Sequence, residues 1–214
     1  HVYHEEFADK INYPTHRGFE KFYGTIYGVV NYFDPFSLVD GEEPVREVPE
    51  GYYVTDDLSQ RAVSYVNEYA KDDKPFFLYL SYWPLHALPE DIEKYKDTYK
   101  VGWEAIRNQR YERIKQLGIF PGQEDFLSQR QFSDKWENNP TAEWDARAMA
   151  VHAAMVDRMD QGIGRVLEAL EKNGQLDNTL ILFLSDNGCS SEQCQNYSPG
   201  ENDRPDMTRD GRPI

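Results

Sequence analysis

Two short runs of apolar residues stand out along the chain, because each has the length of a strand. The first is PFFLYLSY at 75–82. The second begins TLILFL at 179–184 and ends on Ser185, Asp186, Asn187 and Gly188. A continuous apolar run bounded by turn residues is typical of a strand buried on both faces of a parallel sheet. We therefore predict two buried strands, at 75–82 and 179–185.

Apolar residues at helical spacing predict two main helices. The first is expected to begin with Thr55 as its cap and to end near 71–73. Its apolar face consists of Leu58, Ala62, Tyr65, Val66 and Tyr69. The second spans 143–172 and has the strongest pattern in the chain, with Gly174 as a natural stop. Its expected apolar side consists of Trp144, Ala148, Val151, Met155, Met159, Val166, Leu167 and Leu170.

Two glycines inside the second helix, Gly162 and Gly164, are unusual. Each costs ~1 kcal/mol relative to Ala in a helix interior, so we expect a close packing contact or a kink there. Elsewhere, 89–91 opens a short helix and 102–116 forms another. We predict loops and short strands for residues 1–54 and a long surface loop for residues 117–141. Strands alternating with helices predict an α/β layer structure with a mostly parallel sheet.

Composition limits the partners of the chain. It has 214 residues and a formal net charge of -15, with 39% apolar residues available for a core. Such a surface repels phosphate backbones and anionic lipids, so nucleic acid and anionic membranes are not expected partners. The plainer interpretation of the charge is solubility. No run approaches the roughly 18 apolar residues of a membrane span. An anionic substrate would need a metal ion or buried cations.

The chain termini and cysteines add little. No hydrophobic leader or Met stands at the start, so we expect either a mature form or a piece of a longer chain. Cys189 and Cys194 could close a small loop in an exported protein, but C-x4-C without further Cys or His partners is a poor zinc signal.

The strongest candidate chemistry follows the second predicted strand. Asp186 and Asn187 offer a carboxylate and an amide oxygen, which are hard ligands suited to Ca²⁺ or Mg²⁺. Strand ends at the carboxyl edge of an open α/β sheet are also where ligands bind. On this local pattern alone, an Asx turn is the favoured interpretation.

Five blocks of sequence favour the metal-ligand interpretation over the turn. They are PTHRGFEKFYGTIYGVVNYFDP at 14–35, YYVTDDLSQRAVSYV at 52–66, PFFLYLSY at 75–82, WPLHALPEDIEKYK at 83–96, and MVDRMDQGIGRVLEALEKNGQLDNTLI followed by the strand and SDNG. In this order the blocks closely resemble the type I sulfatases, the arylsulfatase-like branch of the alkaline phosphatase superfamily. The resemblance implies that the chain is part of a single catalytic domain with an alkaline-phosphatase-like α/β fold. It also implies that Asp186 and Asn187 are ligands to one calcium ion that holds the sulfate group.

The departures from the family pattern are equally informative. The nucleophile motif C/S-x-P-S-R, whose Cys or Ser becomes formylglycine, has no counterpart among these residues, and neither do the acidic ligands and the Arg near it. The later family Lys is also absent. Tyr82 runs directly into Trp83 where the family has a T-A-P-H unit. We therefore expect that the sequence joins segments of a longer chain and that the 214 residues alone are inactive.

Three histidines have open assignments. His1 fits the last position of the family's G-K-W-H motif, near the sulfate, with His4 as a rival and a disordered first residue as the alternative. His86 falls where the family makes substrate contacts, or it is structural.

The resemblance implies a sulfuric ester hydrolase that cleaves sulfate from a sulfated glycan or an aryl sulfate through a calcium-bound formylglycine site. The alternatives are a phosphodiester or phosphonate hydrolase of the same superfamily and a non-catalytic relative that binds sulfated glycans. The family also implies a periplasmic or secreted location. The natural substrate and the oligomeric state are not indicated by the sequence.

Overall fold

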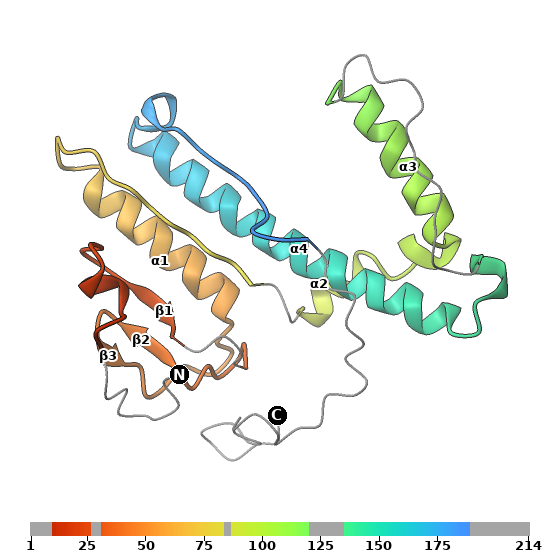
Figure 1. The fold of residues 1–214 in the computed structure, drawn as a ribbon, viewed down its shortest axis with the longest axis horizontal. Coiled ribbons are helices and arrows are strands. Elements are labelled where there is room, and N and C mark those ends of the chain that lie inside the picture. Colours follow the sequence, from red (N-terminus) through yellow and green to blue (C-terminus); the bar gives the residue numbers. More distant parts are fainter. Residues whose placement is uncertain (1–9, 27–30, 84–86, 120–134, 189–214) are drawn as a thin grey trace. The chain divides into compact units, whose positions relative to one another are not determined.

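The computed structural model describes residues 10–26, 31–83, 87–119 and 135–188 (Figure 1). The chain divides into two compact units, one made of residues 1–83 and 159–214 and the other of residues 84–158. The longest helix, α4 (Ala142–Lys172), contributes to both units. None of the described helices combines the length and apolarity that crossing a bilayer requires.

A small antiparallel sheet occupies the N-terminal part of the first unit. Its strands are β1 (Tyr23–Thr25), β2 (Leu38–Asp40) and β3 (Glu43–Pro44), in the order β1-β2-β3. A short 3-10 helix, Pro14–His16, precedes it. Val39 pairs with Gly24 and forms a small buried cluster with Tyr13. The turn into β3 uses Gly41 at φ +63°, a conformation that favours glycine. Loops and short strands were predicted for residues 1–54, and the prediction is confirmed for residues 10–26 and 31–53, the part that the structure describes.

Helix α1 (Val54–Tyr69) begins one residue before the predicted cap. The amides of Asp56 and Asp57 both donate to the carbonyl of Tyr53, which therefore starts the helix. The prediction of Thr55 as the cap is wrong for this reason. Thr55 instead lies buried in the first turn, and its carbonyl accepts a hydrogen bond of 2.7 Å from the Ser59 hydroxyl.

The main core of the first unit lies between α1 and the C-terminal part of α4. Its buried members are Ala62, Val66, Val166, Ala169 and Leu170. Three residues of the extended segment after α1 pack against this cluster: Phe76, Leu78 and Leu80. A 3-10 turn, Leu176–Asn178, then follows α4 after Gly174, which adopts φ +67° at the predicted stop.

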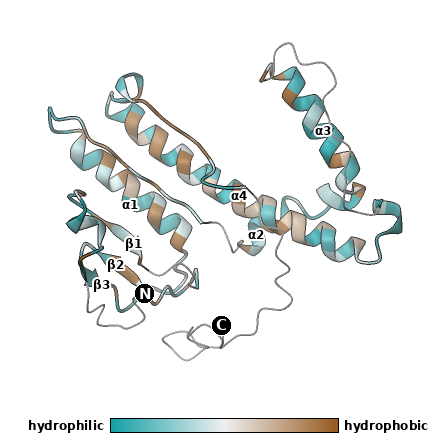
Figure 2. Cartoon of the chain, in the orientation of Figure 1, coloured by the Kyte–Doolittle hydropathy of each residue, from teal (hydrophilic) through white to brown (hydrophobic). Residues whose placement is uncertain are grey.

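The two predicted strands are extended but remain unpaired. Neither 75–82 nor 179–185 belongs to a strand among the described residues, whose only sheet is the antiparallel one. The predicted parallel sheet is therefore not formed within the described part of the chain, because no described segment pairs with these backbones. Residues 180–184 are exposed, and Figure 2 shows the segment after α4 as strongly hydrophobic.

The second unit is helical in its described part. It contains α2 (Pro89–Glu93), the 3-10 turns Thr98–Val101 and Trp136–Asn138, α3 (Trp103–Gln116) and the N-terminal part of α4. The predicted helices at 89–91 and 102–116 are confirmed. Of the predicted surface loop at 117–141, residues 120–134 lie outside the described residues.

The buried face of α4 in this unit differs from the prediction. Trp144 is 66% exposed and Ala148 is also exposed, so both are wrongly assigned to the apolar side. The face that is buried carries Ala146, Ala150 and Ala154, and the last two pack against Ile92 of α2. Small side chains four residues apart let α2 approach α4 closely, which large apolar residues would prevent.

A buried carboxylate holds α2 against α4. Asp91 is 1% exposed, and its carboxylate accepts from Lys94 Nζ at 2.8 Å and lies 3.5 Å from Arg158 Nη1. Lys94 also reaches Asp157 at 2.9 Å. These contacts to Asp91 and Asp157 raise the pKa of Lys94. A buried charge needs such partners to offset its loss of hydration.

Candidate functional site

Asp186 and Asn187 lie at the end of the exposed segment 179–184, and both are exposed. The Ser185 hydroxyl donates a hydrogen bond of 2.7 Å to the carbonyl of Asn187, which closes a tight turn. That turn uses the backbone of Asn187 and leaves its side chain uninvolved. Among the described residues, no hydrogen bond reaches the side chain of Asp186 or Asn187. The local turn therefore leaves the side-chain oxygens of Asp186 and Asn187 available as metal ligands.

The donor chemistry of this pair suits calcium. A carboxylate and an amide carbonyl on adjacent residues are hard oxygen ligands, and Gly188 after them adds no side chain to the turn. Calcium prefers six to eight oxygens, and the described residues contain no group of three or more His, Cys, Asp or Glu side chains that could hold a metal ion. The pair fits part of a calcium site, and its assignment as ligands stays a prediction.

The other predicted site residues cannot be placed. His1 and its rival His4, His86, Cys189 and Cys194 all lie outside the described residues. Their assignments also stay predictions.

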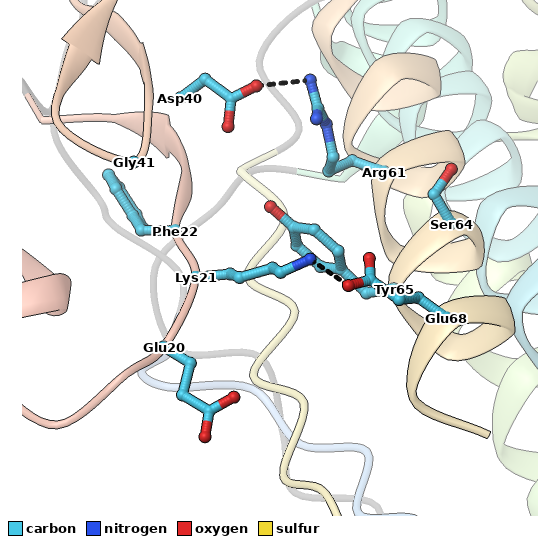
Figure 3. Close-up of a pocket in the computed structure, with 9 residues that line it drawn as sticks. All are labelled: Glu20, Lys21, Phe22, Asp40, Gly41, Arg61, Ser64, Tyr65 and Glu68. Atoms are coloured by element: carbon cyan, nitrogen blue, oxygen red, sulfur yellow. Dashed lines mark hydrogen bonds and ion pairs between the residues drawn. The ribbon is translucent and has the colours of Figure 1, made fainter. Parts of the chain in front are cut away.

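A pocket that sequence reasoning missed lies between the small sheet and α1 (Figure 3). It has a volume of about 310 Å³, and two cations, Lys21 and Arg61, project into it. Arg61 Nη2 lies 3.0 Å from an Asp40 carboxylate oxygen, and Lys21 Nζ contacts Glu68. The hydrogen bond to Glu68 raises the pKa of Lys21. Because both cations already have carboxylate partners, this pocket holds no uncompensated positive charge that would attract a sulfate.

The Lys21 and Arg61 side chains also contact aromatic rings. Arg61 lies 4.1 Å from the ring centroid of Tyr23, and Lys21 lies 5.5 Å from that of Tyr65. Cation–π contacts of this kind are worth about 0.5–1 kcal/mol at exposed sites. No sequence signal would have identified the pocket, because its residues come from three separate segments without a shared motif. We interpret these contacts as fastening the sheet to α1.

A second hollow, of about 370 Å³, lies near the start of α1 and is lined by Tyr52, Tyr53, Asp56, Asp57, Gln60 and Arg165. Arg165 of α4 pairs with Asp56 at 3.1 Å. The carboxylate of Asp57 accepts hydrogen bonds from the hydroxyls of Tyr23 and Tyr52, the latter at 2.9 Å. Burial and the hydrogen bond to Asp57 raise the pKa of Tyr23 to about 12, and burial likewise raises the pKa of Tyr52. Both tyrosines are therefore neutral hydrogen-bond donors near neutral pH, which suits a structural role.

Comparisons with known proteins identify the family. The family model described as Sulfatase matches residues 1–209. An uncharacterized sulfatase of Schizosaccharomyces pombe is 30% identical over 200 residues, which cover 82% of this chain and 36% of that protein. An arylsulfatase of Klebsiella aerogenes is 31% identical over 172 residues, covering 78% of this chain and 36% of the enzyme. The crystal structure of Ps i-CgsB aligns with a TM-score of 0.46 and 25% identity over 79% of this chain and 32% of that one. The chain thus spans about a third of the length of these relatives, and it belongs to the sulfatase family.

Proposed function

We propose that the protein to which these residues belong hydrolyses sulfate esters, with Asp186 and Asn187 among the ligands of a calcium ion. The observation that supports the proposal most directly is the exposed pair of hard oxygen ligands directly after an apolar extended segment, within the span matched by the sulfatase family. Membership of that family makes sulfate-ester hydrolysis the expected reaction.

Calcium bound at this pair would polarise the sulfate oxygens and offset negative charge in the transition state. A net charge of -15 disfavours an anionic substrate, which would need a metal ion or buried cations to bind, and calcium would meet that need. The remaining ligands and the residue converted to formylglycine would come from parts of the protein outside these 214 residues. The 214 residues alone are proposed to be inactive.

Two histidines are also assigned to the proposed site. His1 is assigned to contact with the sulfate or the nucleophile, and His86 to contact with substrate. Both assignments rest on the family pattern, and each predicts that a His→Ala change lowers activity without unfolding the protein.

The substrate class is proposed as an aryl sulfate or a sulfated glycan. An arylsulfatase among the relatives supports the first of these. The proposed location is periplasmic or extracellular, where calcium is available.

The test compares variants of the two proposed ligand residues in the protein made from the complete gene, with 4-nitrocatechol sulfate as substrate. Asp186→Ala and Asn187→Ala are expected to lower kcat/KM by roughly 100-fold or more, since even residues that only support a metal ligand cost 10–100-fold. EDTA should abolish activity and calcium should restore it. The matched control is Asp177→Ala, which removes an exposed carboxylate nine residues before Asp186 and should change nothing.

Calcium binding provides a second readout that does not depend on turnover. Added calcium should raise the Tm of the wild-type protein and of Asp177→Ala, and the increase should shrink in Asp186→Ala. Activity that survives both EDTA and Asp186→Ala would overturn the calcium role. Faster turnover of bis(4-nitrophenyl) phosphate than of the sulfate ester would instead indicate the phosphodiester alternative.

A further inference from the structure

Helix α3 is a local exception to the negative charge of the chain. Four of its residues are cations and two are carboxylates, whereas the chain as a whole has a net charge of -15. The cations are Arg107, Arg110, Arg113 and Lys115, and the carboxylates are Glu104 and Glu112. None of the residues of α3 is buried. Within the described part of the chain, packing in a core therefore does not explain this composition.

The three arginines share one side of the helix. With about 3.6 residues per turn, Arg107, Arg110 and Arg113 fall within roughly a third of the circumference, and Glu104 and Glu112 lie on the other side. We call these three arginines the arginine row. Residues three apart are neighbours on a helix surface, and like charges placed there oppose helix formation. An anion bound along the row would remove this repulsion.

The contacts that hold α3 in place do not account for the row. The helix is anchored at its first turn, where Trp103 packs edge-on against Trp136 and the carboxylate of Glu104 accepts a hydrogen bond of 3.3 Å from the Trp136 amide. Arg110 and Arg113 lie beyond this anchor and are exposed. Among the residues that the structure describes, neither of these two arginines forms an ion pair.

The helix dipole accounts for only part of the row. Cations in the last turn of a helix interact favourably with its C-terminal end, which explains Arg113 and Lys115. This effect falls off within the last turn, whereas Arg107 and Arg110 lie further from the end. Lys115 also has the carboxylate of Glu112 3.9 Å away. The exposed position of Arg110 therefore needs another explanation.

We propose that the arginine row binds sulfate groups of a polyanionic polysaccharide, other than the sulfate that is hydrolysed. A guanidinium donates two parallel hydrogen bonds to the oxygens of an oxyanion, which a lysine cannot do. The row is about 9 Å long, so it suits several anionic groups along one polymer better than a single small ion. The choice of sulfate over other anions rests on the proposed sulfate-ester hydrolysis.

The charge of the rest of the chain favours a flexible polymer over an extended anionic surface. A lipid bilayer or duplex DNA presents its charge to a wide area of protein, and a net charge of -15 would repel it. A polysaccharide chain can contact the row alone, because exposed charges more than about 8 Å away are largely screened at physiological ionic strength. Anionic vesicles and duplex DNA are therefore the competing partners in the test.

The binding test uses the protein made from the complete gene and immobilised heparin, a densely sulfated polysaccharide. Arg110→Gln/Arg113→Gln should raise the Kd roughly 10-fold or more, since two charge-assisted contacts are lost. Wild-type binding should weaken as salt is added, and heparin stripped of its sulfate groups should not compete. The matched control is Lys71→Gln/Lys74→Gln, which removes two exposed cations with the same spacing and should leave the Kd unchanged.

Three outcomes of these measurements would overturn the proposal. The first is an equal Kd for heparin in the wild type and in Arg110→Gln/Arg113→Gln. The second is tighter binding to duplex DNA or to phosphatidylserine vesicles than to heparin, lost in the same variant. The third is a lower Tm of that variant, or its failure to fold, because this would identify a carboxylate of the same protein as the partner. A ligand-binding row predicts an unchanged or slightly higher Tm, since like-charge repulsion is relieved.

Turnover separates this proposal from the proposed function. The kcat/KM for 4-nitrocatechol sulfate should be the same in the wild type and in Arg110→Gln/Arg113→Gln, because this substrate carries a single sulfate group. A lower value in the variant would place the arginines at the catalytic centre and overturn their separate role. Heparin binding through the row without hydrolysis of any sulfate ester would refute the proposed function alone. Hydrolysis together with heparin binding that does not depend on the row would refute only the role of the row.

Discussion

The Oγ atom of Ser59 on α1 lies 2.8 Å from the hydroxyl of Tyr82, and Gly162 of α4 lies directly beside this pair. A Cβ atom at position 162 would stand 2.2 Å from Ser59 Oγ and 2.8 Å from the Tyr82 hydroxyl. The glycine therefore allows α1, α4 and the segment at 75–82 to meet at one point.

Gly162→Ala is expected to destabilise the protein by about 1–3 kcal/mol, in the range of overpacked cores. Gly164→Ala is the matched control, because a Cβ at position 164 meets nothing within 4 Å. Without a clash, Ala in a helix interior should be neutral or stabilise by up to ~1 kcal/mol. The measurement is urea unfolding. In the double variant Gly162→Ala/Ser59→Ala, removal of the Ser59 hydroxyl should recover part of the lost stability. Equal effects of Gly162→Ala and Gly164→Ala would contradict the packing argument.

The Tyr23–Asp57 contact predicts a specific loss of stability at alkaline pH. The pKa of Tyr23 is raised to about 12 in the folded protein, against about 10 in an unfolded chain. The folded state thus keeps a proton that the unfolded state releases, so stability is complete below pH 10 and declines as the pH rises towards 12. The free energy of unfolding should fall across this window in the wild type and fall less in Tyr23→Phe.

The control for that measurement is Tyr111→Phe on α3, which keeps the aromatic ring facing Lys115 and does not touch Asp57. It should leave the pH dependence unchanged. Identical slopes for wild type and Tyr23→Phe between pH 10 and 12 would refute the role assigned to the Tyr23 hydroxyl.

Gly102 before α3 is expected to be the least tolerant of the positive-φ glycines in the second unit. It adopts φ +88°, and a Cβ there would lie 2.3 Å from the indole of Trp136. That ring also packs edge-on against Trp103, with centroids 4.8 Å apart. Gly118→Ala provides the control, since Gly118 has φ +66° but no atom within 4 Å of an added Cβ.

Both substitutions place a side chain at positive φ, and Gly102 at φ 88° and ψ 165° lies in a region that is essentially restricted to glycine. The extra loss in Gly102→Ala therefore combines backbone strain with the contact to Trp136. Gly102→Ala should therefore destabilise by roughly 1–3 kcal/mol more than Gly118→Ala, and its tryptophan fluorescence should shift. The argument fails if the two variants unfold at the same urea concentration with unchanged spectra.

Asp91→Asn tests the buried carboxylate in the second unit while keeping the side-chain shape. The substitution should lower the free energy of unfolding by about 2 kcal/mol. This loss is smaller than that expected for a fully buried ion pair, because the side chain of Lys94 is 47% exposed. Asp97→Asn removes the same charge from an exposed pair with Lys100 and should have no measurable effect. Thermal unfolding of both variants measures the two effects. If Asp91→Asn leaves the Tm unchanged, the shape of the side chain and not its charge holds α2 against α4.

Much of the fold follows from local pattern. The family assignment confirms the predicted α/β, alkaline-phosphatase-like sulfatase class. Helices α2, α3 and α4 begin within one residue of their predicted starts, and α1 begins one residue before its predicted cap. Close contact at Gly162 was predicted from the cost of glycine in a helix, and it is confirmed. At Gly164 no contact explains the residue.

The failures that concern burial and strand pairing share one physical cause, which is that burial depends on partners rather than on hydropathy. Trp144 has a much larger apolar surface than Ala150, yet the alanine is buried because α2 approaches that face of α4. The strands at 75–82 and 179–185 have the right composition, but no neighbouring strand among the described residues. Lys21 and Arg61 come to line one pocket only through tertiary structure, so sequence pattern could not identify it.

Ser185 is the sole residue between the apolar run and Asp186. Side chains on a strand alternate between opposite sides, so a shift in alignment of one position would send the carboxylate to the wrong side of the layer. On a strand, the alignment of residues 179–184 would therefore govern which side the carboxylate of Asp186 reaches. The calcium affinity proposed for Asp186 should accordingly depend on the alignment of the apolar residues that precede it.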